Sequence, residues 1–145
     1  MKAVVQRVKR TRLTVGDNLV SEIPFGLTVF FAVKSGDNET QADYIVKKIA
    51  GLRIFEDENG KMNLSVKDVG GEILFVSQFT LYGDCSHGNR PSFTLAERPE
   101  RAEYLYEYAS EKLAEYGVPV KKGIFGADMQ IEQNNDGPVT IIIET

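Results

Sequence analysis

A polar segment at the end of a strongly apolar run is the first place where this chain could do chemistry. Residues 72–81 start as a run of β-forming apolar side chains, which predicts a buried strand. The run ends in Ser77, Gln78, Phe79 and Thr80, where two hydroxyls and an amide interrupt the apolar pattern. A rigid strand that brings hydroxyl and amide groups to the edge of a core, beside the polar loop 83–91, is a common way to present a reactive site. The competing interpretation is a core strand whose hydroxyls are satisfied by the backbone.

The remaining polar residues argue against several familiar chemistries. His87 is the only histidine, and no carboxylate or thiolate cluster stands near it in the sequence, so we predict no metal site. Cys85 and His87 are neighbours on one loop, and such neighbours rarely achieve the geometry of a nucleophile–base pair. A Ser–His–Asp triad would need the same histidine, and no serine lies in a nucleophile-elbow sequence. Residues 123–126 lack the lysine of a nucleotide-binding loop, and no cofactor is expected.

An enzyme built from these residues would depend on backbone N–H groups, hydroxyls and groups of its own substrate. Arg90, in the loop 88–93, is able to pair with a phosphate, and a solvated loop arginine is the alternative. Gly137–Pro138 is the second feature of interest, because X-Pro bonds adopt the cis form more readily than other peptide bonds, usually in turns. An ordinary trans turn before a strand is the alternative interpretation.

Length and composition indicate one domain with a hydrophobic core. The chain has 145 residues, of which 42% are hydrophobic and 26% charged, as is typical of globular proteins. A net charge of −4 argues against a broad basic face for duplex nucleic acid but leaves room for contact with one nucleic-acid end. No segment approaches the roughly 20 apolar residues of a membrane helix, the N-terminus lacks a signal-peptide core, and Cys85 is the single cysteine. We therefore expect a cytoplasmic protein without a membrane partner.

The elements that would position these residues are many strands and two helices. Apolar patterns predict strands at residues 1–15, 19–23, 27–33, 53–55, 61–65, 72–81, 120–122, 129–133 and 139–143, with a turn at 134–138. Asn38 and Gln41 predict the capping box of a helix that ends near Gly51. Pro99 is suited to the first position of a second helix, and Gly117 lies beyond its end. The pattern predicts an α+β domain in which antiparallel β layers carry helices on one side.

Two short motifs resemble the paired signatures of one protein family. Residues 77–80 (SQFT) and 135–140 (NDGPVT) are similar to the signatures of the D-aminoacyl-tRNA deacylases, also called D-tyrosyl-tRNA deacylases. Further similar blocks are residues 53–55, 60–63, 88–93 and 125–129. The resemblance runs over residues 1–145 as a single deacylase domain. It departs from the family pattern at Arg12, where a small residue is expected, and at Ala32, where glycine is usual.

The resemblance implies a homodimeric hydrolase of the α+β class. The implied fold has three layers, β/β/α, with an antiparallel, barrel-like β core and two main helices. Such an enzyme cleaves the ester bond that joins a D-amino acid to the 3′ ribose of tRNA, and it also removes glycine from mischarged glycyl-tRNA(Ala). It requires no cofactor and no metal.

The resemblance also implies roles for particular residues. The pocket for the terminal adenosine and the ester would be lined by Ser77, Gln78, Phe79 and Thr80. Backbone N–H groups around Phe79 and Thr80 would hold the carbonyl oxygen while the ribose 2′-OH helps to activate water. Gly137–Pro138, in cis, would enter the pocket of the partner subunit, where its carbonyls leave no room for an L side chain. The further substrate-binding positions would be Met129, Asn135 and Arg7, and the tRNA contact would be Arg90.

Two alternatives remain open at this point. A non-catalytic module that binds the 3′ end of tRNA would keep the same pocket, and an esterase for another acyl ester would keep the same chemistry. Thr80 is also a candidate nucleophile, although the sequence places no evident side-chain base beside it.

Overall fold

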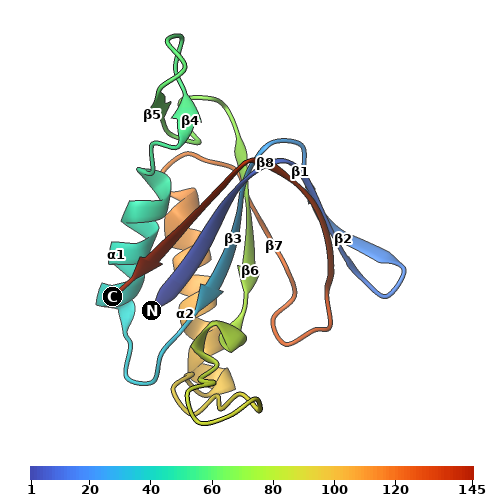
Figure 1. Ribbon diagram of the computed structural model, residues 1–145, viewed down its shortest axis with the longest axis vertical. Helices are drawn as coiled ribbons and strands as arrows, with labels where there is room; N and C mark the ends of the chain where they lie inside the picture. Colours follow the sequence, from blue (N-terminus) through green and yellow to red (C-terminus); the bar gives the residue numbers. More distant parts are fainter.

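The computed structural model describes all 145 residues, and its main sheet is built around strand β1. β1 (Lys2–Val15) pairs with β8 (Gln130–Glu144) along one edge. Along its other edge, the first half of β1 pairs with β3 (Gly26–Ala32) and the second half with β2 (Asn18–Ile23). All these pairs are antiparallel. Since β2 and β3 diverge at the middle of β1, the sheet bends there and curls into a nearly closed barrel (Figure 1).

The other half of the sheet is parallel. β6 (Glu72–Ser77) lies parallel to β3, and β7 (Val120–Lys122) lies parallel to β6. Parallel neighbours need long crossover connections, usually helical ones. The chain supplies them with α1 (Glu39–Ala50) before β6 and α2 (Pro99–Ala114) after it. The predicted antiparallel pairing is therefore confirmed for β1 and its three partners, whereas the helical crossovers make β3, β6 and β7 parallel.

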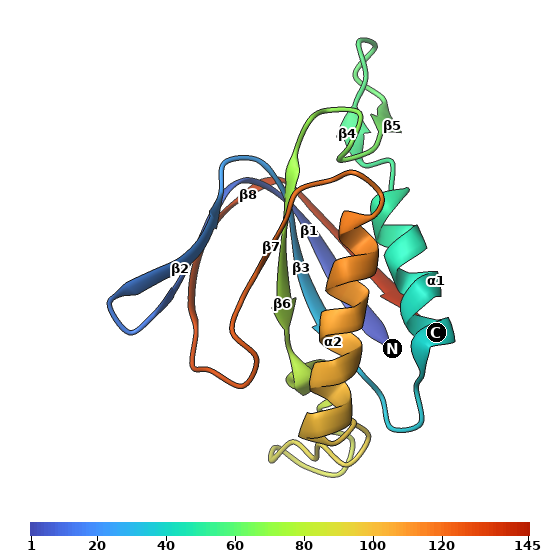
Figure 2. The same ribbon diagram turned by 180° about the vertical axis from the view of Figure 1, so that it is seen from behind.

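Both helices begin as predicted. The Asn38 side chain accepts a hydrogen bond of 2.9 Å from the N–H of Thr40, and the N–H of Asn38 donates one of 3.0 Å to Gln41 Oε1. This reciprocal capping box satisfies two donors that the first turn of α1 leaves free. Pro99 lies in the first turn of α2, where its missing N–H costs nothing. Figure 2 shows the two helices side by side on one face of the sheet.

Apolar side chains cover both faces of the sheet. The larger cluster lies between the sheet and the helices and includes Phe31, Phe75 and Tyr106. The smaller cluster fills the inside of the curled sheet and consists of Val8, Leu13, Ile23, Leu74 and Val76. A hydrogen bond of 2.6 Å from Ser21 Oγ, in β2, to the Lys122 carbonyl, in β7, connects the two ends of the curled sheet. The predicted α+β fold with a β/β/α arrangement is confirmed.

Strand β6 ends earlier than the sequence predicts. The strand expected over residues 72–81 stops at Ser77, and Phe79–Tyr82 forms a 3₁₀-helix, η1. The N–H of Gln78 donates to the Phe31 carbonyl at 2.8 Å, which is the last bond between the two chain segments. Because β3 ends at Ala32, residues beyond 78 have no strand to pair with.

The C-terminal strands are also connected differently from the prediction. The two strands expected at 129–133 and 139–143 form one strand, β8, and the expected turn at 134–138 is an irregularity within it. Asn135 pairs with Val8 and Thr140 pairs with Gln6, so residues 136–139 bulge opposite the single residue Arg7. β1 is a continuous template on both sides of this point, so the ladder resumes after the bulge.

A small hairpin stands apart from the main sheet. It consists of β4 (Phe55–Glu56) and β5 (Met62–Leu64), and it turns at residues 57–60 as predicted.

None of the helices has the length and apolar character that crossing a membrane requires.

Candidate active site

Two free backbone N–H groups mark the end of strand β6. The first N–H groups of a helix have no preceding turn to bond to. In η1 the N–H groups of Phe79 and Thr80 donate to no other group of the protein, and the preceding Gln78 provides no side-chain cap. Two adjacent unpaired donors at the end of a rigid strand are suited to hold an oxygen on which negative charge develops.

The hydroxyl of Thr80 is less suited to a chemical role. Gln78 Nε2 donates a hydrogen bond of 2.5 Å to Thr80 Oγ1. No carboxylate or imidazole makes a hydrogen bond to this hydroxyl. A threonine nucleophile needs an adjacent base to take its proton, so the structure gives the Thr80 side chain no means of activation.

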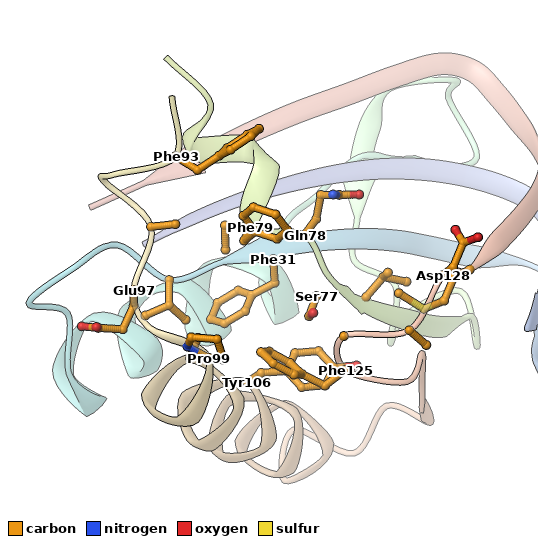
Figure 3. Close-up of a pocket in the computed structure, with 18 of the residues that line it drawn as sticks. Phe31, Ser77, Gln78, Phe79, Phe93, Glu97, Pro99, Tyr106, Phe125 and Asp128 are labelled. Carbon is orange, nitrogen blue, oxygen red and sulfur yellow. The ribbon is translucent and has the colours of Figure 1, made fainter. Parts of the chain in front are cut away.

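A cavity of about 570 Å³ opens beside this turn. It lies at the carboxyl ends of the parallel strands β3 and β6, which is where α/β sheets commonly bind ligands. Figure 3 shows the first turns of α2 on one side and the segment with Phe125 and Asp128 on another. Its apolar walls include Phe31, Val76, Ala102, Tyr106, Phe125, Met129 and Ile131. The volume and the mostly apolar lining fit a small organic group such as a nucleobase.

Tyr106 forms a rigid wall of the cavity. Its ring stacks on Phe75 with a centroid distance of 5.3 Å, and its hydroxyl donates a hydrogen bond of 2.8 Å to the Phe75 carbonyl. Burial raises the pKa of the Tyr106 phenol, so this hydroxyl stays protonated. The hydroxyl therefore fixes the ring rather than acting as a base.

Two carboxylates border the cavity at opposite ends (Figure 3). Glu97 accepts hydrogen bonds from the N–H of Arg98 at 2.8 Å and from the N–H of Gly36 at 3.1 Å. These backbone donors hold the pKa of Glu97 below its usual value, so the group stays charged and ties the β3–α1 loop to the start of α2. Asp128 lies at the other end. No group of three or more His, Cys, Asp or Glu side chains is arranged to hold a metal ion.

The mouth of the cavity carries exposed aromatic rings. Phe79 and Phe93 meet edge to face with a centroid distance of 5.1 Å, and they are 56% and 36% exposed. Exposed aromatic rings are platforms on which nucleobases stack. Arg90 lies on the exposed loop that carries Phe93 and makes no ion pair, but it does not line the cavity.

The bulge in β8 is the second site that the sequence singles out. Arg7 is only 6% exposed, and its Nε lies 3.3 Å from the Asp136 carbonyl and 3.1 Å from Asp136 Oδ2. Its Nη1 donates a hydrogen bond of 2.6 Å to the Ile54 carbonyl. The Gly137–Pro138 bond is cis. At Gly137, with φ +121°, a Cβ would lie 2.8 Å from Val139 Cγ2 and 3.3 Å from Arg7 Nη2, so only glycine fits.

The two sites do not meet within one chain. Ser77, Gln78, Phe79 and Met129 border the cavity, and the free N–H of Thr80 adjoins them. The bulge lies opposite Arg7, whereas Ser77 is level with Ala3, because Ser77 pairs with Phe31 and Phe31 with Ala3. With three strand spacings between them, the two sites are on the order of 20 Å apart.

Several residues of the cavity were not identified as site residues from the sequence. Phe31 and Tyr106 have the apolar patterns of a core strand and a buried helix face, and Glu97 lies in a loop. Only the fold brings these residues to one place. The motif block at 125–129 was the one available signal, and its Phe125 and Met129 line the cavity.

Comparison with known sequences gives full-length matches. The family model described as D-Tyr-tRNA(Tyr) deacylase matches residues 4–144. A protein of Bacillus cytotoxicus named D-aminoacyl-tRNA deacylase is 51% identical over 145 residues, covering 100% of this chain and 99% of the relative. A protein of Desulfitobacterium hafniense with the same name is 54% identical, covering 100% of this chain and 97% of the relative.

Comparison with solved structures gives the same fold. A structure named c-Myc DNA Unwinding Element Binding Protein superposes with a TM-score of 0.92 at 45% identity, covering 100% of this chain and 99% of that one. A structure described as a probable eukaryotic D-amino acid tRNA deacylase superposes with a TM-score of 0.86 at 18% identity. The second match covers 98% of this chain and 97% of that one, and it concerns the fold alone.

Proposed function

Since the chain belongs to the D-Tyr-tRNA(Tyr) deacylase family, we propose that it hydrolyses the ester bond between a D-amino acid and the 3′-terminal ribose of tRNA. The products are the free D-amino acid and tRNA. The observation that carries this proposal is the pair of free N–H groups of Phe79 and Thr80 beside an apolar cavity of about 570 Å³. Such an arrangement suits an ester that is attached to a nucleobase-bearing ribose.

In this proposal the cavity holds the terminal adenosine and the strand end holds the ester. The apolar walls around Phe31 and Tyr106 accept the base, and Ser77 and Gln78 border the ribose. The ester carbonyl oxygen lies at the two free N–H groups, which stabilise the negative charge of the tetrahedral intermediate. Water adds to the carbonyl carbon, the bond to the ribose 3′ oxygen breaks, and that oxygen leaves with a proton.

The base for this water is the substrate's own ribose 2′-OH. The protein offers no evident base at Thr80, whose hydroxyl accepts a hydrogen bond from the neutral amide of Gln78. The neighbouring 2′-OH of the substrate is able to orient the water and relay its proton. Thr80 then contributes through its backbone N–H rather than through its hydroxyl.

Chiral selection in this proposal comes from the main chain of Gly137–Pro138 on a second copy of the protein. Both residues are exposed on the β8 bulge, and the buried Arg7 holds that bulge. The separation between a chain's own bulge and its own cavity favours a homodimer with shared pockets. The bulge carbonyls occupy the place where an L side chain would point, so L substrates are rejected. Glycine has no side chain to reject, and glycyl-tRNA(Ala) is therefore a second substrate.

The remaining contacts involve tRNA and the other half of the pocket. Met129 lines the cavity directly, and Asn135 supports the bulge from β8. Arg90 binds a phosphate near the tRNA end, since it is exposed and forms no ion pair with the protein. Residues 1–145 act as one deacylase domain, and the place of action is the cytoplasm, where charged tRNA is used.

The test is release of amino acid from D-Tyr-tRNA, L-Tyr-tRNA and Gly-tRNA(Ala) at catalytic protein concentration. We expect release from the D and glycyl substrates and protection of the L substrate. Binding of tRNA without any release would support the non-catalytic module. Equal release of both enantiomers, or hydrolysis of simple esters instead, would support the general esterase. A protein that is monomeric in solution at assay concentration would contradict the shared pocket.

A further inference from the structure

Side chains hold the β8 bulge from both faces of the sheet, and Arg7 lies on one of these faces. Gln6 and Arg7 are successive residues of β1, so their side chains point to opposite faces. Arg7 contacts the bulge at Asp136, which is the first of its four residues. Nothing on the Arg7 face holds the far end of the bulge through a polar side chain.

On the opposite face, a chain of side-chain hydrogen bonds spans the bulge. Gln6 Nε2 donates to the hydroxyl of Thr140 at 3.2 Å, on the residue just after the bulge. Gln133 Nε2 donates to Gln6 Oε1 at 2.6 Å and to Asn135 Oδ1 at 2.8 Å, just before the bulge. We call Gln6, Gln133, Asn135 and Thr140 the amide latch.

We propose that Gln6 and Gln133 are positioning residues that set the direction of the Gly137–Pro138 carbonyls through the amide latch. This inference rests on the proposed function, in which those carbonyls reject L-aminoacyl groups. Arg7 and Lys9 hold only Asp136, and the β1–β8 ladder holds only the residues before and after the bulge, so neither fixes the orientation of the peptides from Gly137 to Val139. The amide latch joins the side chains on either side of the bulge and limits how far these peptides can rotate.

The donor end of Gln133 is the part that matters. Its Nε2 makes both contacts, while its Oε1 is buried without a hydrogen-bond partner. Gln133→Met keeps the length of the side chain but removes its polar atoms, so Gln6 and Asn135 lose their hydrogen bonds to this position even if their own amides turn over. This substitution therefore breaks the amide latch without opening a large cavity.

The experiment compares kcat/KM for D-Tyr-tRNA with kcat/KM for L-Tyr-tRNA in matched variants. For Gln133→Met we expect the D/L ratio to fall by about 10-fold or more, mainly because the L substrate is admitted. The control is Gln130→Met, which makes the same replacement on an exposed residue of the same strand that has no side-chain hydrogen bond. That control should keep the wild-type ratio.

A loss of general stability would lower both activities together, so the ratio separates positioning from folding. Thr140→Val removes one exposed hydroxyl, is compatible with a strand, and should lower the D/L ratio by roughly 2-fold to 5-fold. A double variant, Gln6→Ala with Gln133→Met, should be no less selective than the worse of the two single variants, since both break one latch.

Unchanged D/L ratios in both Gln133→Met and Thr140→Val would overturn the inference while leaving the proposed function intact. If Gln133→Met does not fold, an unchanged ratio in Thr140→Val is enough to overturn it. Failure of the proposed function looks different, because the unaltered protein would then show no preference for the D substrate.

Discussion

The end of β6 and the bulge of β8 present main-chain groups to their surroundings in opposite ways. At the end of β6 a parallel strand runs out of partners, and the N–H groups of Phe79 and Thr80 are left free by the geometry of η1. At the bulge an edge strand keeps its partner, and side chains from β1 hold an irregular segment in place. The first site depends on where strands end, and the second depends on individual side chains.

This difference predicts how each site responds to substitution. Side-chain changes at the end of β6 should matter little unless they remove a main-chain donor. Side-chain changes at Arg7 should matter greatly, because Arg7 is the buried side chain that joins the bulge to the Ile54 carbonyl.

The largest effect is expected from removing a donor at the end of β6. Thr80→Pro removes an N–H that takes no part in the hydrogen bonds of η1 and should lower kcat by about 10²–10³. Thr80→Ala keeps the N–H and should lower kcat by less than about 10-fold. Single-turnover deacylation of D-Tyr-tRNA measures both. Equal losses in the two variants would indicate that the hydroxyl, not the main chain, carries the chemistry.

The next largest effect is expected from replacing Arg7, the buried arginine of β1 that contacts the bulge. Arg7→Ala leaves the Ile54 carbonyl without its side-chain donor and leaves Asp136 with only the longer contact of 3.6 Å to Lys9 Nζ, and it should lower the free energy of unfolding by about 2–4 kcal/mol. The matched control is Arg10→Ala on the same strand, whose ion pair with Glu22 is exposed, and it should cost less than about 1 kcal/mol. Urea unfolding followed by circular dichroism gives both values. Similar costs would show that the bulge does not depend on Arg7.

A smaller effect is expected at the cavity wall. Tyr106→Phe removes one of two hydrogen bonds to the buried Phe75 carbonyl, which keeps the bond of 3.0 Å from the N–H of Gly123, and should cost about 0.5–1.5 kcal/mol of stability. Tyr108→Phe, on the same helix, removes an exposed hydrogen bond to Asp43 and should cost less than about 0.5 kcal/mol. Thermal unfolding of the two variants, with KM for D-Tyr-tRNA, checks whether the wall supports substrate binding as well as the fold.

The smallest effect concerns how the stability of the protein changes at acidic pH. The backbone N–H groups of Arg98 and Gly36 lower the folded-state pKa of Glu97 below the ordinary 4.5. A lowered carboxyl pKa contributes stability that is present above pH 4.5 and is lost as the pH falls through the folded-state pKa. Glu97→Gln should therefore be slightly less stable than the parent at pH 7, and this difference should shrink toward pH 3. A difference that stays constant over this range would contradict the assignment.

The features that could be predicted from sequence are those fixed by near neighbours. The capping box of Asn38 and Gln41 and the proline start of α2 involve residues within one turn, so composition alone reveals them. The continuous apolar run at 27–33 likewise predicts a strand buried on both faces, which β3 is. The two motifs were identified through family resemblance, which reflects the whole chain.

The features that could not be predicted depend on partners far away in the chain. η1 begins where it does because β3 ends at Ala32, and the predicted turn at 134–138 became a bulge because β1 continues past it. The cavity is bordered by Phe31, Ser77 and Tyr106, which come from three separate elements. Periodicity identifies such residues as buried but does not say which of them share a cavity.

The pairing of β1 with β8 affects how the chain folds during its synthesis. Lys2 lies opposite Glu144, so the ladder that joins them closes a loop of nearly the whole chain. During synthesis β1 therefore keeps one bare hydrogen-bonding edge until the segment that forms β8 has emerged from the ribosome. We expect folding to proceed in milliseconds to seconds rather than microseconds, with nascent chains open to edge-to-edge aggregation meanwhile.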